Sequence, residues 1–296
     1  MEQIEILKRK IESARELQSL VKTMKALAAV NIREYGQAVE SLIEYNRTIE
    51  MGLQIIMRNR PEEIEIVMPV QKDRLGAIIF GSDQGLCGTF NEQIAYYAID
   101  RMNELKIKQE GRAILALGER VIARLEEAGQ QVEQRFSFFG DNAGITQVMQ
   151  QVLIIIEEWR LKRDIEQVVL FYNRPISAAS YRPDMLYLLP LDLEWLKDLA
   201  KKEWPSRTLP AFTMDWGQLF SSLIRQYLFF SLYRAFVESL ASENASRLSS
   251  MQVAQKNIEE RLKELGTLFH SQRQASITME LLDIVTGFEA LTGERR

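Results

Sequence analysis

The stretch EQIEILKRKIESARELQSLVKTMKALAAVNIR, residues 2–33, decides the fold of this chain. Its apolar residues step by three or four positions, at Ile4, Leu7, Ile11, Ala14, Leu17, Val21, Met24 and Ala28. The mean step is about 3.5 residues, which is typical of a coiled-coil seam rather than of the broader apolar stripe of a globular helix. The stretch therefore predicts a long N-terminal helix that packs along a second helix.

Proline places that second helix at the other end of the chain. All seven prolines lie between Pro61 and Pro210, so residues 1–60 and 211–296 contain none. Because a proline inside a helix costs about 3 kcal/mol, both ends are expected to be long helices. Seam-like spacing recurs near the C-terminus, at Leu248, Met251, Ile258, Leu262, Leu265 and Phe269, and then at Ile277, Leu281, Ile284, Phe288 and Leu291.

Short β-rich runs alternate with helical stretches in the middle of the chain. The expected strands are 75–80, 112–118, 166–172 and 184–189, and the expected helices lie near 91–108, 118–129 and 144–162. This alternation predicts an α/β domain with a largely parallel sheet. We therefore expect an N-terminal coiled-coil helix over 1–60, an α/β domain over 61–211 and a C-terminal coiled-coil helix over 212–296.

Two helices that bracket one domain are expected to pair as an antiparallel coiled coil. At 1.5 Å per residue the first helix, of about 57 residues, is ~85 Å long, and the second, of about 80 residues, is ~120 Å long. The second should therefore overhang the first by roughly 35 Å. Its overhanging end, ITMELLDIVTGFEAL (277–291), is apolar on much of its surface, so we expect it to lie inside a partner.

Composition excludes several classes of function. The net charge is −4, and no stripe of aromatic residues alternates with Lys and Arg, so no nucleic-acid partner is expected. With one cysteine, Cys87, and one histidine, His270, the chain cannot build a zinc site from several Cys and His ligands. His270 falls in a long helical stretch and is interpreted as a solvated or interface side chain.

The glycine-rich segment GSDQGLCG, residues 81–88, follows an expected strand and precedes an expected helix. Such a turn could hold a phosphate at the helix N-terminus, but its spacing is neither GxGxxG nor that of a P-loop. The favoured interpretation is a tight loop that allows close backbone approach, with Asn91 as the N-cap of the next helix. Cys87 is interpreted as a small packed thiol.

Three parts of the chain resemble the gamma subunit of F-type ATP synthases. LVKTMKALAAVNIRE (20–34) is similar to ITKAMKMVAAAKLRR of that family, and SDQGLCGTFN (82–91) is similar to SDRGLCGGFN. LYRAFVESLASENASRLSSMQVAQKN (232–257) and SQRQASITMELLDIVTGFEAL (271–291) resemble the family's long closing helix. The segments occur in the family's order over essentially the whole chain, which makes the resemblance specific.

The resemblance implies a coiled coil inside a hexamer of alternating alpha and beta subunits. It implies a Rossmann-like α/β domain at the foot, which binds the epsilon subunit and the membrane ring of c subunits. Such a chain is a rotor shaft that transmits torque, carries no catalytic residue and binds no cofactor or metal. Its expected location is peripheral, on the cytoplasmic face of a bacterial inner membrane or the equivalent face of a thylakoid-type membrane.

The resemblance also implies functional positions. Those expected to meet the beta subunit are Met24, Lys25, Ser82, Asp83, Cys87, Arg273 and Gln274. Polar positions of the closing helix that are linked to coupling are Arg247, Thr278, Glu280 and Asp283. Gln84 stands where the family usually has Arg, and Thr89 where it has Gly, so the loop lacks one positive charge.

Three alternatives remain open at this stage. The departures in the loop allow a gamma subunit of a divergent second F-type ATPase, one that translocates sodium ions. A dinucleotide-binding enzyme would use the segment 81–88 as its phosphate loop. A coiled-coil scaffold with no motor role would require the motif matches to be accidental.

Overall fold

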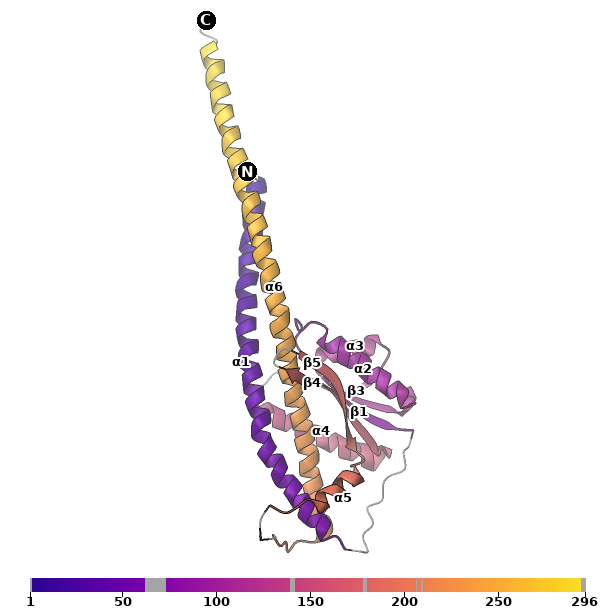
Figure 1. The fold of residues 1–296 in the computed structure, drawn as a ribbon. Coiled ribbons are helices and arrows are strands. Elements are labelled where there is room, and N and C mark those ends of the chain that lie inside the picture. Colours follow the sequence, from indigo (N-terminus) through magenta and orange to yellow (C-terminus); the bar gives the residue numbers. More distant parts are fainter. Residues whose placement is uncertain are drawn as a thin grey trace. The chain divides into compact units, whose positions relative to one another are not determined.

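The computed structural model describes residues 2–61, 73–138, 142–177, 180–205, 207–208 and 210–293. The chain divides into two compact units, one of residues 1–27 with 248–296 and the other of residues 28–247. Two long helices, α1 (Glu2–Arg58) and α6 (Trp216–Gly293), supply residues to both units (Figure 1). The expectation of one long helix at each end is confirmed.

The unit of residues 28–247 is built on a five-stranded sheet with the order β3-β2-β1-β4-β5. Four strands run parallel, namely β1 (Leu75–Phe80), β2 (Arg112–Leu117), β3 (Val132–Phe136) and β4 (Gln167–Ser177), and β5 (Ser180–Leu189) runs antiparallel to β4. The expected largely parallel sheet is confirmed. Strand β3 was not expected, because only its first residue is buried and the segment therefore lacks an apolar run.

Every residue of β1 is buried, because helices cover both faces of the sheet. Leu75, Ala77 and Ile79 pack with α2 (Phe90–Glu104) and α3 (Glu119–Glu127). The alternate residues Ile78 and Phe80 pack with α4 (Asn142–Arg163) and with the part of α6 around Phe236. Figure 1 shows α2 and α3 together on one side of the sheet and α4 on the other.

A third apolar cluster in this unit joins the end of α1, the start of α6 and α5 (Leu193–Lys201). Trp216 fixes this helical base, because its Nε1 donates a hydrogen bond of 2.8 Å to the carbonyl oxygen of Ile56. Helix α5 was missed from the sequence, although it carried a start signal. Asp192 is its N-cap, and the carboxylate accepts hydrogen bonds from the backbone N–H groups of Glu194 and Trp195. A short 3₁₀ turn, Gln109–Gly111, precedes β2.

The other unit pairs the start of α1 with the second half of α6. Lys25 Nζ donates a hydrogen bond of 3.2 Å to Gln255 Oε1, while Ile4 and Lys8 line a shallow groove with Phe269 and Ile277. Residue numbers therefore rise along one helix as they fall along the other. The pair is antiparallel, as expected.

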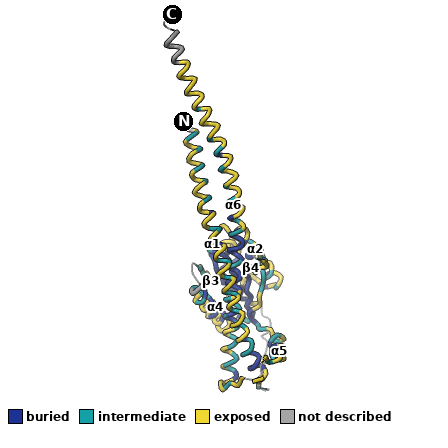
Figure 2. The backbone as a smooth tube through the Cα atoms, turned by 60° about the vertical axis from the view of Figure 1, so that its left-hand side comes forward, coloured by how far each residue is buried: buried dark blue, intermediate teal, exposed yellow. Residues whose placement is uncertain are grey.

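The seam of α1 differs from the expected one at a single step. Leu17 was expected to face the partner helix, but it is 54% exposed, and Gln18 is half-buried in its place. A strict seven-residue repeat that starts at Ile4 and Ile11 reaches Gln18 and then Lys25, so two polar residues lie on the seam. In α6 the expected residues are buried or half-buried, namely Leu248, Met251, Ile258, Leu262, Leu265 and Phe269 (Figure 2).

Beyond its contacts with the start of α1, helix α6 continues with apolar side chains in solvent. Met279, Leu282 and Ile284 are 63%, 58% and 69% exposed, and Leu281 and Val285 are exposed as well. The side chains of Phe288 and Leu291, which were assigned to the same stripe, lie outside the described residues. Within the part of the chain that is described, no helical segment has the length and apolar character of a membrane span.

Candidate functional site

The loop that follows β1 is held by its own side chains. Gly81 has no room for a side chain, since a Cβ there would lie 2.3 Å from Cβ of Val121. Ser82 N donates to Asn91 Oδ1 over 2.9 Å, and Asn91 Nδ2 donates back to Ser82 Oγ over 2.8 Å. The prediction that Asn91 caps α2 is therefore wrong. The N-cap position is Thr89, and Asn91 is the second residue of the helix, where its amide closes the loop.

Asp83 ties the same loop to two neighbouring segments. Its Oδ1 accepts a hydrogen bond of 3.0 Å from the backbone N–H of Glu119 at the start of α3. Its Oδ2 accepts one of 2.6 Å from the backbone N–H of Phe138, which follows β3. The carboxylate thus positions the loop at the carboxyl edge of the sheet, where helix starts and strand ends meet.

Cys87 is buried inside the loop, and its Sγ lies 3.4 Å from Ser82 Oγ. Burial raises the pKa of the Cys87 thiol above its ordinary value, because a low-polarity site disfavours the thiolate. The interpretation as a packed thiol agrees with this environment. The loop turns its exposed side chains outward at Gln84, Leu86 and Thr89, and Leu86 has a positive φ of 65°.

One turn of α6 binds the inner side of this loop. Ser246 Oγ donates to the carbonyl oxygen of Cys87 over 2.6 Å. Arg247 Nη2 donates to the carbonyl oxygens of Gln84 and Gly85 over 3.3 and 3.5 Å. The same Nη2 lies 2.6 Å from Oε1 of Glu243, one helical turn earlier. We call Glu243, Ser246 and Arg247 the α6 anchor.

The structure therefore brings together four of the expected site residues, Ser82, Asp83, Cys87 and Arg247. Sequence reasoning missed Glu243 and Ser246. The signal for Glu243 was present, because Glu and Arg four positions apart on a helix can form an ion pair. No comparable local signal marks Ser246, since its acceptor is far away in the sequence.

Burial shapes the electrostatics of the anchor. The pKa of Glu243 is raised mainly by burial; the charge and the hydrogen bond of Arg247 oppose this shift, and the charge of Asp83 adds to it. A polar cavity of about 290 Å³ lies beside the pair, with Asn31 and Tyr35 of α1 in its wall. Burial also raises the pKa of the Tyr35 hydroxyl, and the charge of Glu243 adds to that shift.

The backbone groups of the loop are arranged in the opposite way to those of a phosphate site. A phosphate site presents backbone N–H groups to the ligand. Here Ser82 N–H is bonded to Asn91, and the carbonyl oxygens of Gln84 and Gly85 face the guanidinium of Arg247. This geometry gives no support to a dinucleotide site at 81–88. Within the described residues, no three His, Cys, Asp or Glu side chains gather as a metal site would require.

Met24 and Lys25 lie on the coiled coil of the unit that contains the chain ends. Both side chains are half-buried, and Lys25 is held by Gln255. The remaining expected positions, Arg273, Gln274, Thr278, Glu280 and Asp283, lie further along α6 and are all exposed. Thr278 Oγ1 donates to the carbonyl oxygen of Gln274, so this hydroxyl is satisfied within the helix. His270 is exposed and makes an edge contact with Phe269.

Comparison with known proteins covers nearly the full length of the chain. Residues 3–291 match the family model described as ATP synthase. The ATP synthase gamma chain of Pasteurella multocida (strain Pm70) is 30% identical over 292 residues, which cover 96% of this chain and 98% of that protein. The ATP synthase gamma chain of Nostoc punctiforme is 26% identical over 319 residues, covering 99% of this chain and 100% of that protein.

Solved structures share the fold. A chain of the Euglena gracilis mitochondrial ATP synthase, in a structure of OSCP, F1 and the c-ring, superposes with a TM-score of 0.65 at 18% identity, covering 99% of this chain and 96% of that chain. A chain in the rotor of the same enzyme gives a TM-score of 0.60 at 17% identity, covering 93% of this chain and 99% of that chain. At this identity the likeness establishes the α/β fold with long terminal helices.

Proposed function

Because this chain belongs to the gamma chain family of ATP synthases, we propose that it is the central rotor shaft of an F-type ATP synthase. In this role it transmits torque between a membrane ring of c subunits and a catalytic hexamer of alpha and beta subunits. ATP chemistry belongs to the hexamer, and this chain contributes no catalytic residue. It is a peripheral subunit on the cytoplasmic face of a bacterial inner membrane or the equivalent face of a thylakoid-type membrane.

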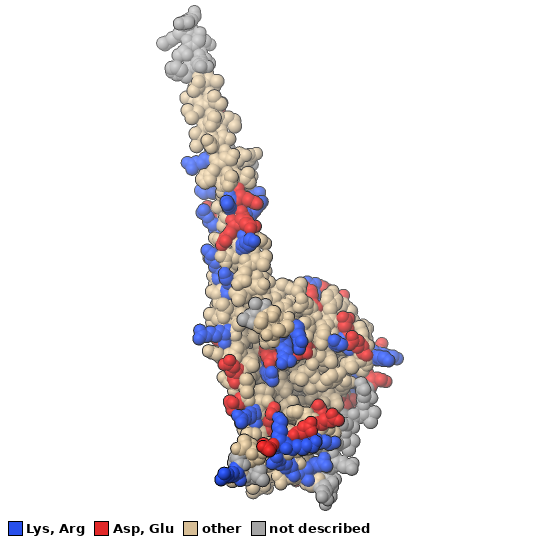
Figure 3. Space-filling model, viewed as in Figure 1, with Lys and Arg blue, Asp and Glu red and all other residues tan. Residues whose placement is uncertain are grey.

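The observation that carries this proposal is the free end of α6. Residues 277–285 expose apolar side chains at consecutive and alternate positions, including Leu281, Leu282, Ile284 and Val285, and thus on several sides of one helix. On the face drawn in Figure 3, this end is uncharged. Exposed apolar side chains in such number mark a surface that a partner covers. In the proposed complex, the surrounding subunits form an apolar bearing that covers these side chains while the helix turns.

The proposal assigns a task to each part of the chain. Residues 1–60 and 212–296 form the shaft, and residues 61–211 form the α/β foot that binds the epsilon subunit and the c-ring. Met24 and Lys25 on the coil, Ser82, Asp83 and Cys87 in the loop, and Arg273 and Gln274 on α6 serve contacts with beta. For the loop, the contact is made by the outward side chains of Gln84, Leu86 and Thr89, which Ser82, Asp83 and Cys87 hold in place.

The remaining polar residues of α6 have two tasks in this proposal. Arg247 sets the position of the loop through its carbonyl contacts. Thr278, Glu280 and Asp283 present polar groups among the exposed apolar residues at the end of the helix. Polar groups at those positions weaken the binding between the shaft and its bearing. A rotating contact requires such weak binding.

Reconstitution tests the rotor function directly. The chain is expressed with the alpha and beta subunits of its own organism, and the purified complex is assayed for ATP hydrolysis and then, with the membrane sector, for ion pumping. We expect a stable complex whose pumping requires this chain. Failure to co-purify with alpha and beta, or ATP-driven pumping that is unchanged without the chain, would overturn the proposal.

A further inference from the structure

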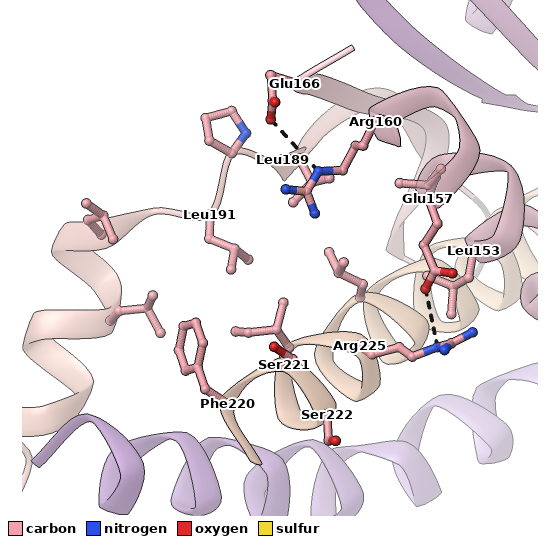
Figure 4. A pocket seen from close by; sticks show the side chains of 16 residues that line it. Leu153, Glu157, Arg160, Glu166, Leu189, Leu191, Phe220, Ser221, Ser222 and Arg225 are labelled. Carbon is pink, nitrogen blue, oxygen red and sulfur yellow. Dashed lines mark ion pairs between the residues drawn. The ribbon is translucent and has the colours of Figure 1, made fainter. Parts of the chain in front are cut away.

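A hollow of about 520 Å³ opens in the unit of residues 28–247 (Figure 4). It lies between the core of α4 and the sheet on one side and the helical base of α5 and α6 on the other. Small-molecule sites usually have volumes of roughly 300–1,000 Å³ and apolar walls with few polar groups. The size of this hollow falls in that range.

The wall of the hollow is mainly apolar. Leu153, Leu189 and Leu196 line it and are buried. Leu191, Leu193, Phe220 and Ile224 also line it but are only half-buried, so part of their apolar surface meets water. Figure 4 shows Leu191 and Phe220 turned toward the open space. An aliphatic occupant would remove this surface from water, which is favourable.

One cation faces the hollow in a geometry that suits an anion. Nε of Arg160 in α4 lies 3.9 Å from Oε2 of Glu166, and Figure 4 shows the two terminal nitrogens of Arg160 directed into the open space. Arg225, the other arginine of the wall, turns away toward Glu157, with 3.5 Å between Nε and Oε1. The two terminal nitrogens of a guanidinium form a planar fork that matches a carboxylate.

We propose that this hollow binds an amphiphile that has an aliphatic body and a carboxylate head, such as a fatty acid. The carboxylate binds the terminal nitrogens of Arg160, and the aliphatic chain lies against Leu191, Phe220 and Ile224. The two carboxylates of the wall, Glu157 and Glu166, are already paired with Arg225 and Arg160, so a cationic head would find no unpaired carboxylate there. An uncharged head would lack the charge-assisted hydrogen bonds that a carboxylate forms with Arg160. The inference rests on the geometry of this hollow and does not depend on the rotor function.

Calorimetric titration of the full chain with dodecanoate, below its critical micelle concentration, tests the proposal. Dodecanol and dodecyltrimethylammonium serve as the uncharged and cationic probes. We expect saturable one-to-one binding of dodecanoate and weaker binding of the other two. Arg160→Gln should weaken dodecanoate binding by about five- to tenfold, because a charge-assisted pair is lost, and should leave dodecanol binding unchanged.

Two further variants separate binding in the hollow from binding elsewhere. Ser221→Phe adds bulk at an exposed position of the wall, so it should weaken both dodecanoate and dodecanol. Arg261→Gln removes an exposed arginine that is paired with Glu264 on another part of α6, so it should change neither. Unchanged melting temperatures check that the variants fold.

Several results would overturn the proposal. These are binding that does not saturate, equal affinity for the cationic probe, or dodecanoate affinity that is the same in Arg160→Gln and Ser221→Phe as in the parent chain. The titration is repeated on the complex with alpha and beta subunits, where retained binding supports the site. Loss of binding on assembly would mean that a partner side chain fills the hollow, and the proposal would fail for the assembled enzyme.

Discussion

The guanidinium of Arg247 lies 2.6 Å from the carboxylate of Glu243, and its Nη2 also lies 3.3 Å from the carbonyl oxygen of Gln84. Only 7% of Arg247 and 8% of Glu243 is exposed to solvent. Arg247, paired with Glu243 on its own helix, thus helps to join α6 to the loop after β1. The outward side chains of that loop are therefore positioned by a helix that lies more than a hundred residues away in the sequence.

Replacing Arg247 by Ala should lower the free energy of unfolding by about 3–5 kcal/mol, because the Glu243 carboxylate would stay buried without its partner. Glu243→Leu combined with Arg247→Met should cost much less than the two single changes added together. Urea denaturation followed by tryptophan fluorescence measures these differences. Costs that simply add would show that the two groups do not interact.

Alkylation of Cys87 should be slow and should begin at high pH. Since burial raises the pKa of this thiol, the folded chain holds less thiolate at pH 8 than an ordinary cysteine does. The midpoint of the iodoacetamide rate against pH should therefore lie higher in the folded chain than in the same chain unfolded in guanidinium. Equal midpoints, or a lower one in the folded chain, would contradict the buried position.

Met24→Lys should impair coupling more than assembly. Met24 is half-buried on the coil beside Lys25, and an added cation there would bind acidic groups of a partner at some rotary angles. Near a protein surface such a pair is worth ~4 kcal/mol at 4 Å before desolvation is subtracted. The rotor should therefore be more stable at the angles where the pair forms, and should pause there. We expect retained hydrolysis with fewer ions pumped per ATP. Normal pumping per ATP would remove Met24 from the interface.

The double change Arg273→Ala with Gln274→Ala should lower turnover without blocking assembly. Both side chains are exposed on α6, where they are available for a polar contact that forms and breaks during rotation. Arg261→Ala is the matched control, because Arg261 is an exposed arginine of the same helix that pairs only weakly with Glu264. Steady-state ATP hydrolysis by the assembled complexes decides the matter. If the double variant and the control both turn over as the parent does, Arg273 and Gln274 have no role in rotation.

Removing residues 277–296 should make the isolated chain less prone to associate. The deletion takes away the exposed side chains of Met279, Leu282 and Ile284, which have no partner among the described residues of this chain. Light scattering over a range of protein concentrations compares the deleted and full-length chains. If association is unchanged after the deletion, the chains associate through another surface.

The framework of the chain follows from local sequence patterns. The absence of proline at both ends and the spacing of residues such as Ile4 and Ile11 predicted two long helices, because helix stability and seam formation depend on neighbours three to seven positions apart. The buried strand Leu75–Phe80 was also visible as an uninterrupted apolar run. The edge strand Val132–Phe136 was not, since an edge strand with one buried residue has no such run.

The arrangement of the site was decided by tertiary structure. The sequence identified Ser82, Cys87 and Arg247 as site residues only through resemblance. It predicted that Asn91 caps α2, which is wrong. Which groups meet depends on how β1, α2 and α6 pack, and the contact between Ser246 and Cys87 spans 159 positions. No local pattern encodes such a distance, because the hydrogen bond forms only after the sheet and both helices have brought the two segments together.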